Sequence, residues 1–194
     1  MYTVIGKEKT NRLEKHIYKY SKELHEDYSD TLCKEFLNEL YLELPSKEEF
    51  IAKFKKLSYS KNKDWYPDIE VNFKRQITHV LMEYEIFENS DDDPIPKKFT
   101  LEHVQDDSNG GLSCLIGNII PLSSKDNKAC NGKTIAEKID IYNRSSYSAP
   151  RLLIEKMQEN YEQTTTYWSD HYIEGRTTKL ANLFYKEIWK NKFI

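Results

Sequence analysis

The chain has 194 residues, enough for one sizeable domain or two small ones, and 31% of them are charged against 38% that are apolar. No apolar run approaches the ~20 residues of a membrane-spanning helix and the first residues lack a signal-peptide core, so we expect a cytoplasmic protein without a membrane partner. The formal net charge of −3 excludes nucleic-acid binding by global attraction, although residues 97–194 hold 14 Lys and Arg against 12 Asp and Glu.

The first 88 residues carry apolar side chains at helical spacing, with lysine and glutamate between them. Helices are expected over residues 7–28, 30–42, 46–57 and 67–84, with a loop over 61–66. Ser46 and Glu49 form the capping-box pattern that starts the third helix, and Pro67 suits the start of the fourth. No catalytic constellation is found in these helices, so residues 1–88 are predicted to form a helical connector or support region.

Residues 89–98 are acidic, rich in turn-forming residues and interrupted by prolines, which is typical of a linker. Residues 99–194 are then predicted to form the second domain. Two short apolar segments flank a Gly-rich turn over 106–111, a pattern that predicts strand, loop and strand. Helices are expected over 124–140, from Pro150 onward, and over 166–189. The predicted fold class is therefore α+β and mostly helical.

Polar side chains recur along these central elements. Glu102 and His103 close the first expected strand, Asn118 lies within the second apolar run, residues 112–122, and Asn127 lies in the helix that follows. His103 and Asn118 are 15 positions apart, and Asn118 and Asn127 are 9 apart. The order strand, loop, strand and helix can bring these side chains to one point.

This spacing of Glu102-His103, Gly117-Asn118 and Asp126-Asn127 resembles the HNH, or ββα-metal, nuclease motif. The surrounding sequence is similar to the C-terminal nuclease domain of GmrSD-type restriction endonucleases. Further matching positions are Leu101, 116–123, 131–133, 136–138, Tyr167, Trp168, Ile173, Arg176, Leu180, Ile188 and Trp189. The resemblance implies a small ββα-metal motif embedded in helices, and residues 1–96 resemble the helical connector of longer members. Family members usually carry a proline where this chain has Asp106.

The chemistry of phosphodiester hydrolysis assigns an expected role to each motif residue. A base must take a proton from water, and the leaving oxygen and the phosphorane need their charge neutralised. Histidine exchanges protons near neutral pH, so His103 is the expected general base. Glu102 and Asn127 offer the oxygen atoms that hard cations prefer, so they are the expected ligands of Mg²⁺ or Mn²⁺. The resemblance implies that Asn118 braces the loop and orients the histidine.

Several polar residues after the motif are candidates for contacts to the substrate. Asn131 lies one helical turn after Asn127, so we predict that it shares this face and contacts phosphate or the water bound to the metal; a capping or surface role is the alternative. Three lysines are near enough to contact DNA phosphates, with a solvated helix face as the alternative: Lys128, Lys133 and Lys138. Arg176 is expected in a structural salt bridge rather than in a DNA contact.

The resemblance implies a metal-dependent DNA endonuclease of a restriction or anti-phage defence system, which hydrolyses foreign, often modified, phage DNA. Longer members carry an NTP-dependent domain upstream. Because no Walker-type glycine loop occurs here, such a domain or subunit is an expected partner. One alternative is a catalytically degenerate helical module that binds DNA or protein. Another is an RNA-cutting toxin with the same site.

Overall fold

The computed structural model describes residues 11–43, 45–89 and 98–189 and divides the chain into two compact units. One unit consists of Met1–Phe54 and Ala181–Ile194, and the other of Lys55–Leu180. This division differs from the predicted domains, because residues 55–88 belong to the same unit as the strands. Most of the predicted linker lies outside the described residues. Within the described part of the chain, no helix has the length and apolar character to cross a membrane.

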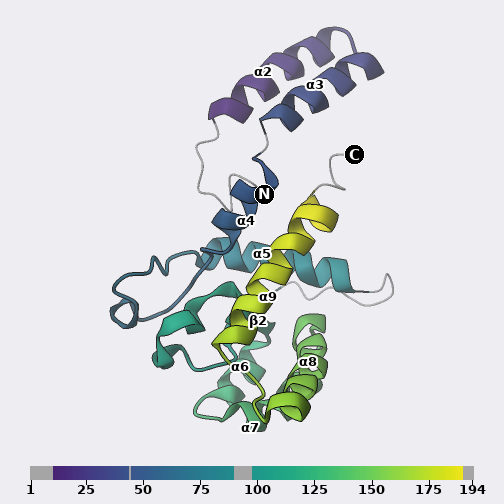
Figure 1. Cartoon of the computed structure of the whole chain (residues 1–194). Coiled ribbons are helices and arrows are strands. Elements are labelled where there is room, and N and C mark those ends of the chain that lie inside the picture. The colour runs from purple at the N-terminus through teal and green to yellow at the C-terminus, as the bar shows by residue number, and fades with distance from the viewer. Residues whose placement is uncertain (1–10, 44, 90–97, 190–194) are drawn as a thin grey trace. The chain divides into compact units, whose positions relative to one another are not determined.

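The first unit contains a helical hairpin and two further helical segments (Figure 1). Its elements are α2 (Asn11–Glu26), α3 (Asp30–Leu42), α4 (Lys47–Phe54) and the π-helical turn η5 (Phe184–Trp189). The bounds of α3 match the prediction, because Ser29 accepts a hydrogen bond from the Leu32 backbone and caps the helix. The predicted capping box of α4 is also confirmed, since Ser46 and Glu49 bind each other's backbone N–H.

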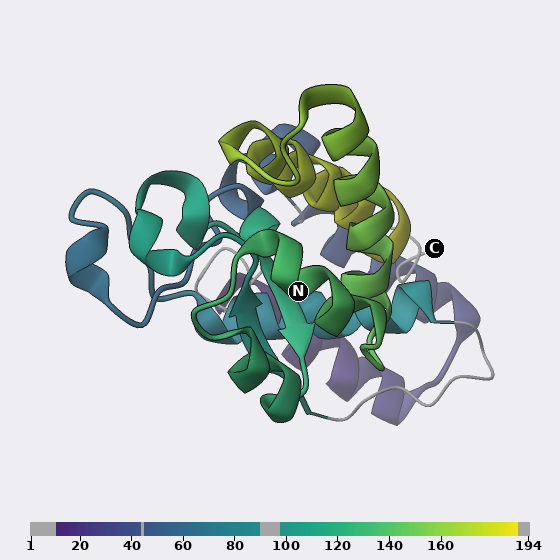
Figure 2. The same ribbon diagram turned by 90° about the horizontal axis from the view of Figure 1, so that it is seen from below.

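The second unit holds a two-stranded sheet surrounded by helices. Its elements are η1 (Lys63–Trp65), α5 (Lys74–Glu88), β1 (Thr100–His103), η2 (Asp107–Asn109), η3 (Gly111–Cys114), η4 (Ile116–Asn118), β2 (Ile119–Leu122), α6 (Ser124–Cys130), α7 (Ile135–Asn143), α8 (Ser148–Thr164) and α9 (Asp170–Leu183), whose residues from Ala181 onward belong to the first unit. Strands β1 and β2 pair antiparallel with His103 opposite Ile119, and Figure 2 shows them as neighbouring arrows of opposite direction. The predicted order strand, loop, strand and helix is confirmed, as is the mostly helical α+β class.

The helix predicted from Pro67 is wrong in its start, because α5 begins at Lys74. The residues before it form a turn and then an isolated bridge between Asn72 and Tyr59, within a small set of backbone hydrogen bonds around residues 57–60. Ser58 accepts from Phe73 N at 3.1 Å, and Tyr59 N donates to Cys114 O at 2.8 Å. Long-range pairing therefore replaces helical bonding in this segment, and it ties residues 57–60 to the loop between the strands.

The single helix predicted over 124–140 is also wrong, because α6 ends at Cys130 and α7 begins at Ile135. Gly132 has a φ of +70°, which a helix cannot contain. Thr134 then caps α7 in a full capping box with Glu137. The final helix begins at Asp170 rather than at 166, because Thr165 ends α8 in the left-handed region.

The core of the second unit lies between the strands and the helices α6 to α9. Its buried members are Val104, Ile120, Leu122, Cys130, Ile141, Tyr142, Leu153, Ile154, Met157, Trp168 and Ile173. Every side chain of β2 is buried, as the burial of all four residues from Ile119 to Leu122 indicates. Strand β2 therefore has little contact with solvent, and it anchors the preceding loop, which carries Asn118, in the core.

The three cysteines are free thiols, and they differ in exposure. Burial raises the pKa of Cys114 and of Cys130 to about 12, whereas Cys33 is half-buried on α3. Because alkylation requires an accessible thiolate, iodoacetamide at pH near 8 should label only Cys33 in the folded chain and all three thiols in urea. Mass spectrometry counts the labels. Rapid labelling of Cys114 or Cys130 in the folded protein would contradict the burial described here.

Candidate functional site around His103

His103 is the last residue of β1, and its side chain leaves the sheet toward residues 59 and 107. Its Nε2 lies 2.9 Å from the Tyr59 carbonyl oxygen, and the two rings stack at 6.1 Å with an interplanar angle of 19°. A carbonyl oxygen only accepts, so Nε2 carries a hydrogen in this arrangement and Nδ1 keeps the lone pair in the neutral ring. The side chain retains 13% exposure, which leaves an accessible edge.

Asp107 forms a polar cluster next to the imidazole. Its Oδ1 lies 3.7 Å from His103 Nε2 and accepts a hydrogen bond from Tyr66 at 2.8 Å, while Oδ2 accepts from Ser60 at 2.7 Å. The Tyr66 hydroxyl also lies 2.7 Å from Ser113 Oγ. Burial raises the pKa of Tyr66 well above its ordinary value, so its hydroxyl remains protonated. This network holds one carboxylate in a fixed place beside the histidine.

Asn118 is fully buried and braces the turn that follows His103. Its Nδ2 donates to Gln105 O at 2.8 Å and to Ser113 O at 2.7 Å, while its Oδ1 accepts from Gln105 N at 2.9 Å and from Trp168 Nε1 at 3.2 Å. One amide therefore satisfies both backbone groups of Gln105. These bonds fit the bracing role expected for Asn118, and they reach the histidine through the backbone.

Replacing Asn118 by alanine should lower the free energy of unfolding by about 2–4 kcal/mol, because buried backbone groups and the Trp168 N–H lose their partner. Urea unfolding followed by circular dichroism measures this loss. Asn109→Ala is the matched control, since Asn109 is exposed at the end of η2, and it should change stability by no more than about 0.5 kcal/mol. Equal stability of the two variants would show that Asn118 does not brace the turn.

Gly117 lets α9 approach the loop before β2 more closely than any other residue could. A Cβ at this position would lie 2.1 Å from Ile173 O and 2.3 Å from Thr177 Oγ1. Gly117 N donates to Thr177 Oγ1 at 3.1 Å, and Arg176 Nη1 donates to Gly117 O at 2.7 Å and to Ile119 O at 3.0 Å. Burial lowers the pKa of Arg176 to about 10, so it stays charged at neutral pH. The salt bridge expected for Arg176 is wrong in its partner, because its guanidinium donates to the backbone carbonyl groups of Ile116, Gly117 and Ile119.

Glu102 occupies the opposite face of β1 from His103, as alternation along a strand requires. Its carboxylate is buried and forms an ion pair of 2.8 Å with Lys138 of α7, and Tyr142 donates to it at 3.4 Å. Lys138 also donates to the carbonyl oxygens of His103 and Val104. The sequence predicted a phosphate contact or a solvated helix face for Lys138. Both predictions are wrong, because its side chain is buried within the protein.

Asn127 lies on α6, where its Nδ2 donates to Leu101 O at 2.9 Å and ties the helix to β1. Cys130 is three positions later and thus on the same face of the helix. Burial first, and then the nearby Glu102 carboxylate, raises the pKa of Cys130. The Asn127 side of α6 therefore faces the Glu102 side of β1, on the face away from the imidazole.

The oxygen atoms of Glu102 and Asn127 fit a hard divalent cation in type, since one carboxylate, one amide and water form a common ligand set for Mg²⁺. The charge of Glu102 is, however, already balanced by Lys138. No group of three or more His, Cys, Asp or Glu residues suited to a metal ion occurs within residues 11–43, 45–89 and 98–189. A cation at this site would thus depend on two protein ligands rather than on a carboxylate cluster.

The remaining candidates lie on the surface near α6. Asn131 is exposed and is the C-cap residue of α6, with φ −56° and ψ 128°, and its contact with phosphate or with metal-bound water stays a prediction. Lys128 and Lys133 are exposed, and their contact with phosphate stays a prediction. Asp106, at the position of the family proline, has a φ of −53° and caps η2 through Ser108. Its backbone therefore has the conformation that proline would impose.

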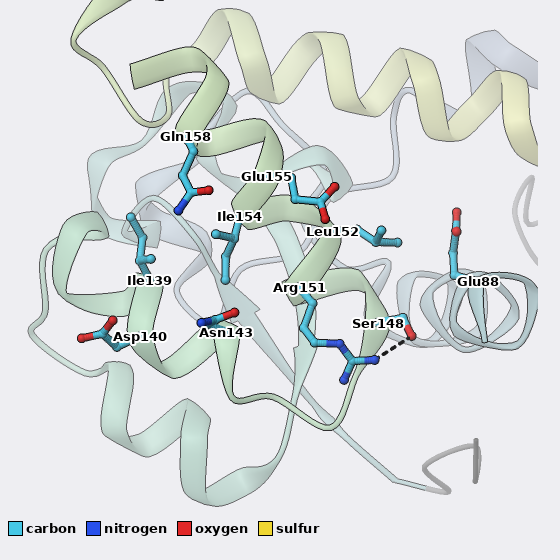
Figure 3. Close-up of a pocket in the computed structure, with 10 residues that line it drawn as sticks. All are labelled: Glu88, Ile139, Asp140, Asn143, Ser148, Arg151, Leu152, Ile154, Glu155 and Gln158. Atoms are coloured by element: carbon cyan, nitrogen blue, oxygen red, sulfur yellow. Dashed lines mark hydrogen bonds between the residues drawn. The ribbon is translucent and has the colours of Figure 1, made fainter. Parts of the chain in front are cut away.

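A separate pocket of ≈ 610 Å³ lies between α7 and α8, with Glu88 of α5 at one side (Figure 3). Ile139 and Ile154 give it an apolar wall, and Arg151 turns toward Ser148 and donates to Ser145 O at 2.7 Å. None of the residues predicted for the site lines this pocket. The predicted site and this pocket are therefore separate places in the fold.

The cluster around His103 contains residues that sequence reasoning missed. Three of them come from a loop that lies 41 to 47 positions before the residues that they contact: Tyr59, Ser60 and Tyr66. The fourth, Asp107, lies four positions after His103, so its closeness in sequence could have indicated the contact. The structure brings Asn118 to the backbone that follows His103, whereas Glu102 and Asn127 lie on the other face of β1. Comparison of the chain with protein-family models, with curated proteins and with solved structures gives no match.

Proposed function

We propose that this protein is a divalent-metal-dependent DNA endonuclease of the HNH type, akin to the nuclease domain of GmrSD-type restriction enzymes. One observation carries the proposal: a histidine ends the first strand of an antiparallel pair, an asparagine clamps the turn after it, and the second strand leads into a helix bearing another asparagine. This arrangement supports the roles that the sequence resemblance implies for His103, Asn118 and Asn127.

His103 acts in this proposal as the base that activates water. The Tyr59 carbonyl engages Nε2–H and directs the lone pair to Nδ1, which then accepts the proton of the attacking water. The Asp107 carboxylate lies beside the ring, with its Oδ1 3.7 Å from Nε2. Asn118 keeps the backbone after the histidine from shifting, so that the ring stays aligned during the reaction.

Glu102 and Asn127 are the residues that would hold Mg²⁺ or Mn²⁺. When bound, such an ion neutralises charge on the leaving oxygen and on the phosphorane. Lys128 and Lys133 are exposed beside this region and would neutralise phosphate groups of the DNA. Foreign or phage DNA as substrate, an upstream NTP-dependent domain or subunit as partner, and a cytoplasmic location extend the proposal by resemblance.

A nicking assay tests the proposal directly. Supercoiled plasmid is incubated with the full chain and Mg²⁺ or Mn²⁺, beside the His103→Ala variant and beside a matched RNA substrate. Conversion of plasmid to the relaxed form by the unaltered chain, and not by the variant, supports the endonuclease. Preferential cleavage of RNA would instead support the hypothesis that the protein is an RNA-cutting toxin.

A second function is favoured by one specific observation, the ion pair between Glu102 and Lys138. If this carboxylate never binds a cation, the protein is a degenerate module that binds DNA or protein without cleaving it. Electrophoretic mobility shifts in EDTA, combined with intact plasmid in Mn²⁺, would support this function. Metal-dependent nicking would eliminate it.

A further inference from the structure

Lys138 is a buried lysine whose ammonium group is fully engaged. Its side chain is 7% exposed, and its Nζ lies 2.8 Å from Glu102 Oε1, 2.8 Å from His103 O and 3.2 Å from Val104 O. An ammonium group has three hydrogens, so these three acceptors match its donor capacity. Lys138 thus connects the predicted metal ligand on one face of β1 to the backbone that carries the predicted base.

Two further groups lie beside the Glu102 carboxylate, and neither carries a positive charge. Tyr142 donates to the carboxylate and Cys130 lies beside it, and burial raises the pKa of both groups, so both stay neutral. A buried carboxylate needs a cation or a strong set of hydrogen bonds. Lys138 supplies that charge in this structure.

Resting on the proposed function for its metal, we infer that Lys138 is the resident cation of Glu102 and competes with a divalent ion for this carboxylate. Two cations beside one buried carboxylate repel each other, so metal binding must displace the ammonium group or weaken its contact. Displacement also releases the carbonyl groups of His103 and Val104. Occupation of the metal site is thereby coupled to the backbone next to the predicted base.

Calorimetric titration of the full chain with Mn²⁺ tests this competition without measuring cleavage. Lys138→Met keeps most of the length of the side chain and removes its charge, so it should bind Mn²⁺ at least about 10-fold more tightly than the unaltered chain. Glu102→Gln, alone or combined with Lys138→Met, should abolish the binding. Lys133→Met is the matched control, because Lys133 is exposed, and it should leave the affinity unchanged. Equal or weaker Mn²⁺ binding by Lys138→Met overturns the inference.

Thermal unfolding gives a second readout. Lys138→Met should lower Tm by roughly 10 °C in EDTA, because Glu102 is left buried without a partner. Saturating Mn²⁺ should recover most of this loss, and adding Glu102→Gln should recover it without metal. If Lys138→Met folds only in Mn²⁺, the inference is supported as well. If Mn²⁺ neither raises its Tm nor restores its folding, Lys138 is a structural lysine and the inference fails.

These outcomes separate the inference from the proposed endonuclease activity. If the unaltered chain nicks plasmid but Lys138→Met gains no Mn²⁺ affinity, the proposed function stands and the inferred competition is wrong. If the unaltered chain does not nick plasmid but Lys138→Met gains Mn²⁺ affinity and metal-dependent stability, the inferred competition stands and the proposed endonuclease activity is wrong.

Discussion

The His103→Ala protein should lose about 10²–10⁴-fold of the plasmid-nicking rate of the unaltered chain in Mg²⁺ or Mn²⁺, which is the usual contribution of a general base. The substitution removes the Nδ1 lone pair and leaves the Tyr59 carbonyl without its N–H donor. His103 lies at the end of β1 with an accessible edge, so the fold should survive its truncation. Initial rates of relaxation of supercoiled DNA, with circular dichroism as the check on folding, measure the effect.

His25→Ala is the matched control for this experiment, since His25 is exposed in the last turn of α2 and lies in the other unit. It should nick at the rate of the unaltered chain. Nicking by His103→Ala at this same rate would show that another group, or a contaminating nuclease, cleaves the DNA. The proposal that His103 and the residues around it activate water for DNA cleavage would then be wrong.

Replacing Gly117 by alanine should destabilise the fold by roughly 3 kcal/mol, a Tm loss near 10 °C, because the new methyl group has no room. It would lie 2.1 Å from Ile173 O and 2.3 Å from Thr177 Oγ1, so α9 must move away. That movement would break the hydrogen bond from Gly117 N to Thr177 Oγ1 and weaken the hydrogen bond from Arg176 to Gly117 O. Thermal and urea unfolding measure the loss.

Gly175→Ala is the matched control, because Gly175 lies in the middle of α9 and an added Cβ there meets nothing within 4 Å. A helical Gly→Ala change at an open position should stabilise the protein by about 0.5–1 kcal/mol. The two alanines are thus expected to act in opposite directions. If Gly117→Ala also stabilised the protein, the close approach of α9 to the loop would be incorrect.

The sequence alone predicted the elements whose stability is local. The bounds of α3, the capping box of α4 and the order of β1, β2 and α6 follow from caps and from periods of 3.6 and 2 residues, which act over a few positions. It also identified His103, Asn118 and Asn127 by type and spacing. It failed where a local pattern conflicted with a turn, as at Gly132, and where backbone pairing across the fold prevented a helix, as before Lys74.

The tertiary structure decided which groups surround each of these side chains. Tyr59 and Tyr66 reach the His103 cluster from more than 40 positions away, and nothing in their local sequence indicates that contact. Alternation along β1 turned Glu102 away from His103, and only the packing of α7 determined that a lysine would meet it. Electrostatic pairing and burial depend on neighbours in space, whereas capping and periodicity depend on neighbours in the chain. That difference in range is why the sequence specified the candidate residues and the fold specified their partners.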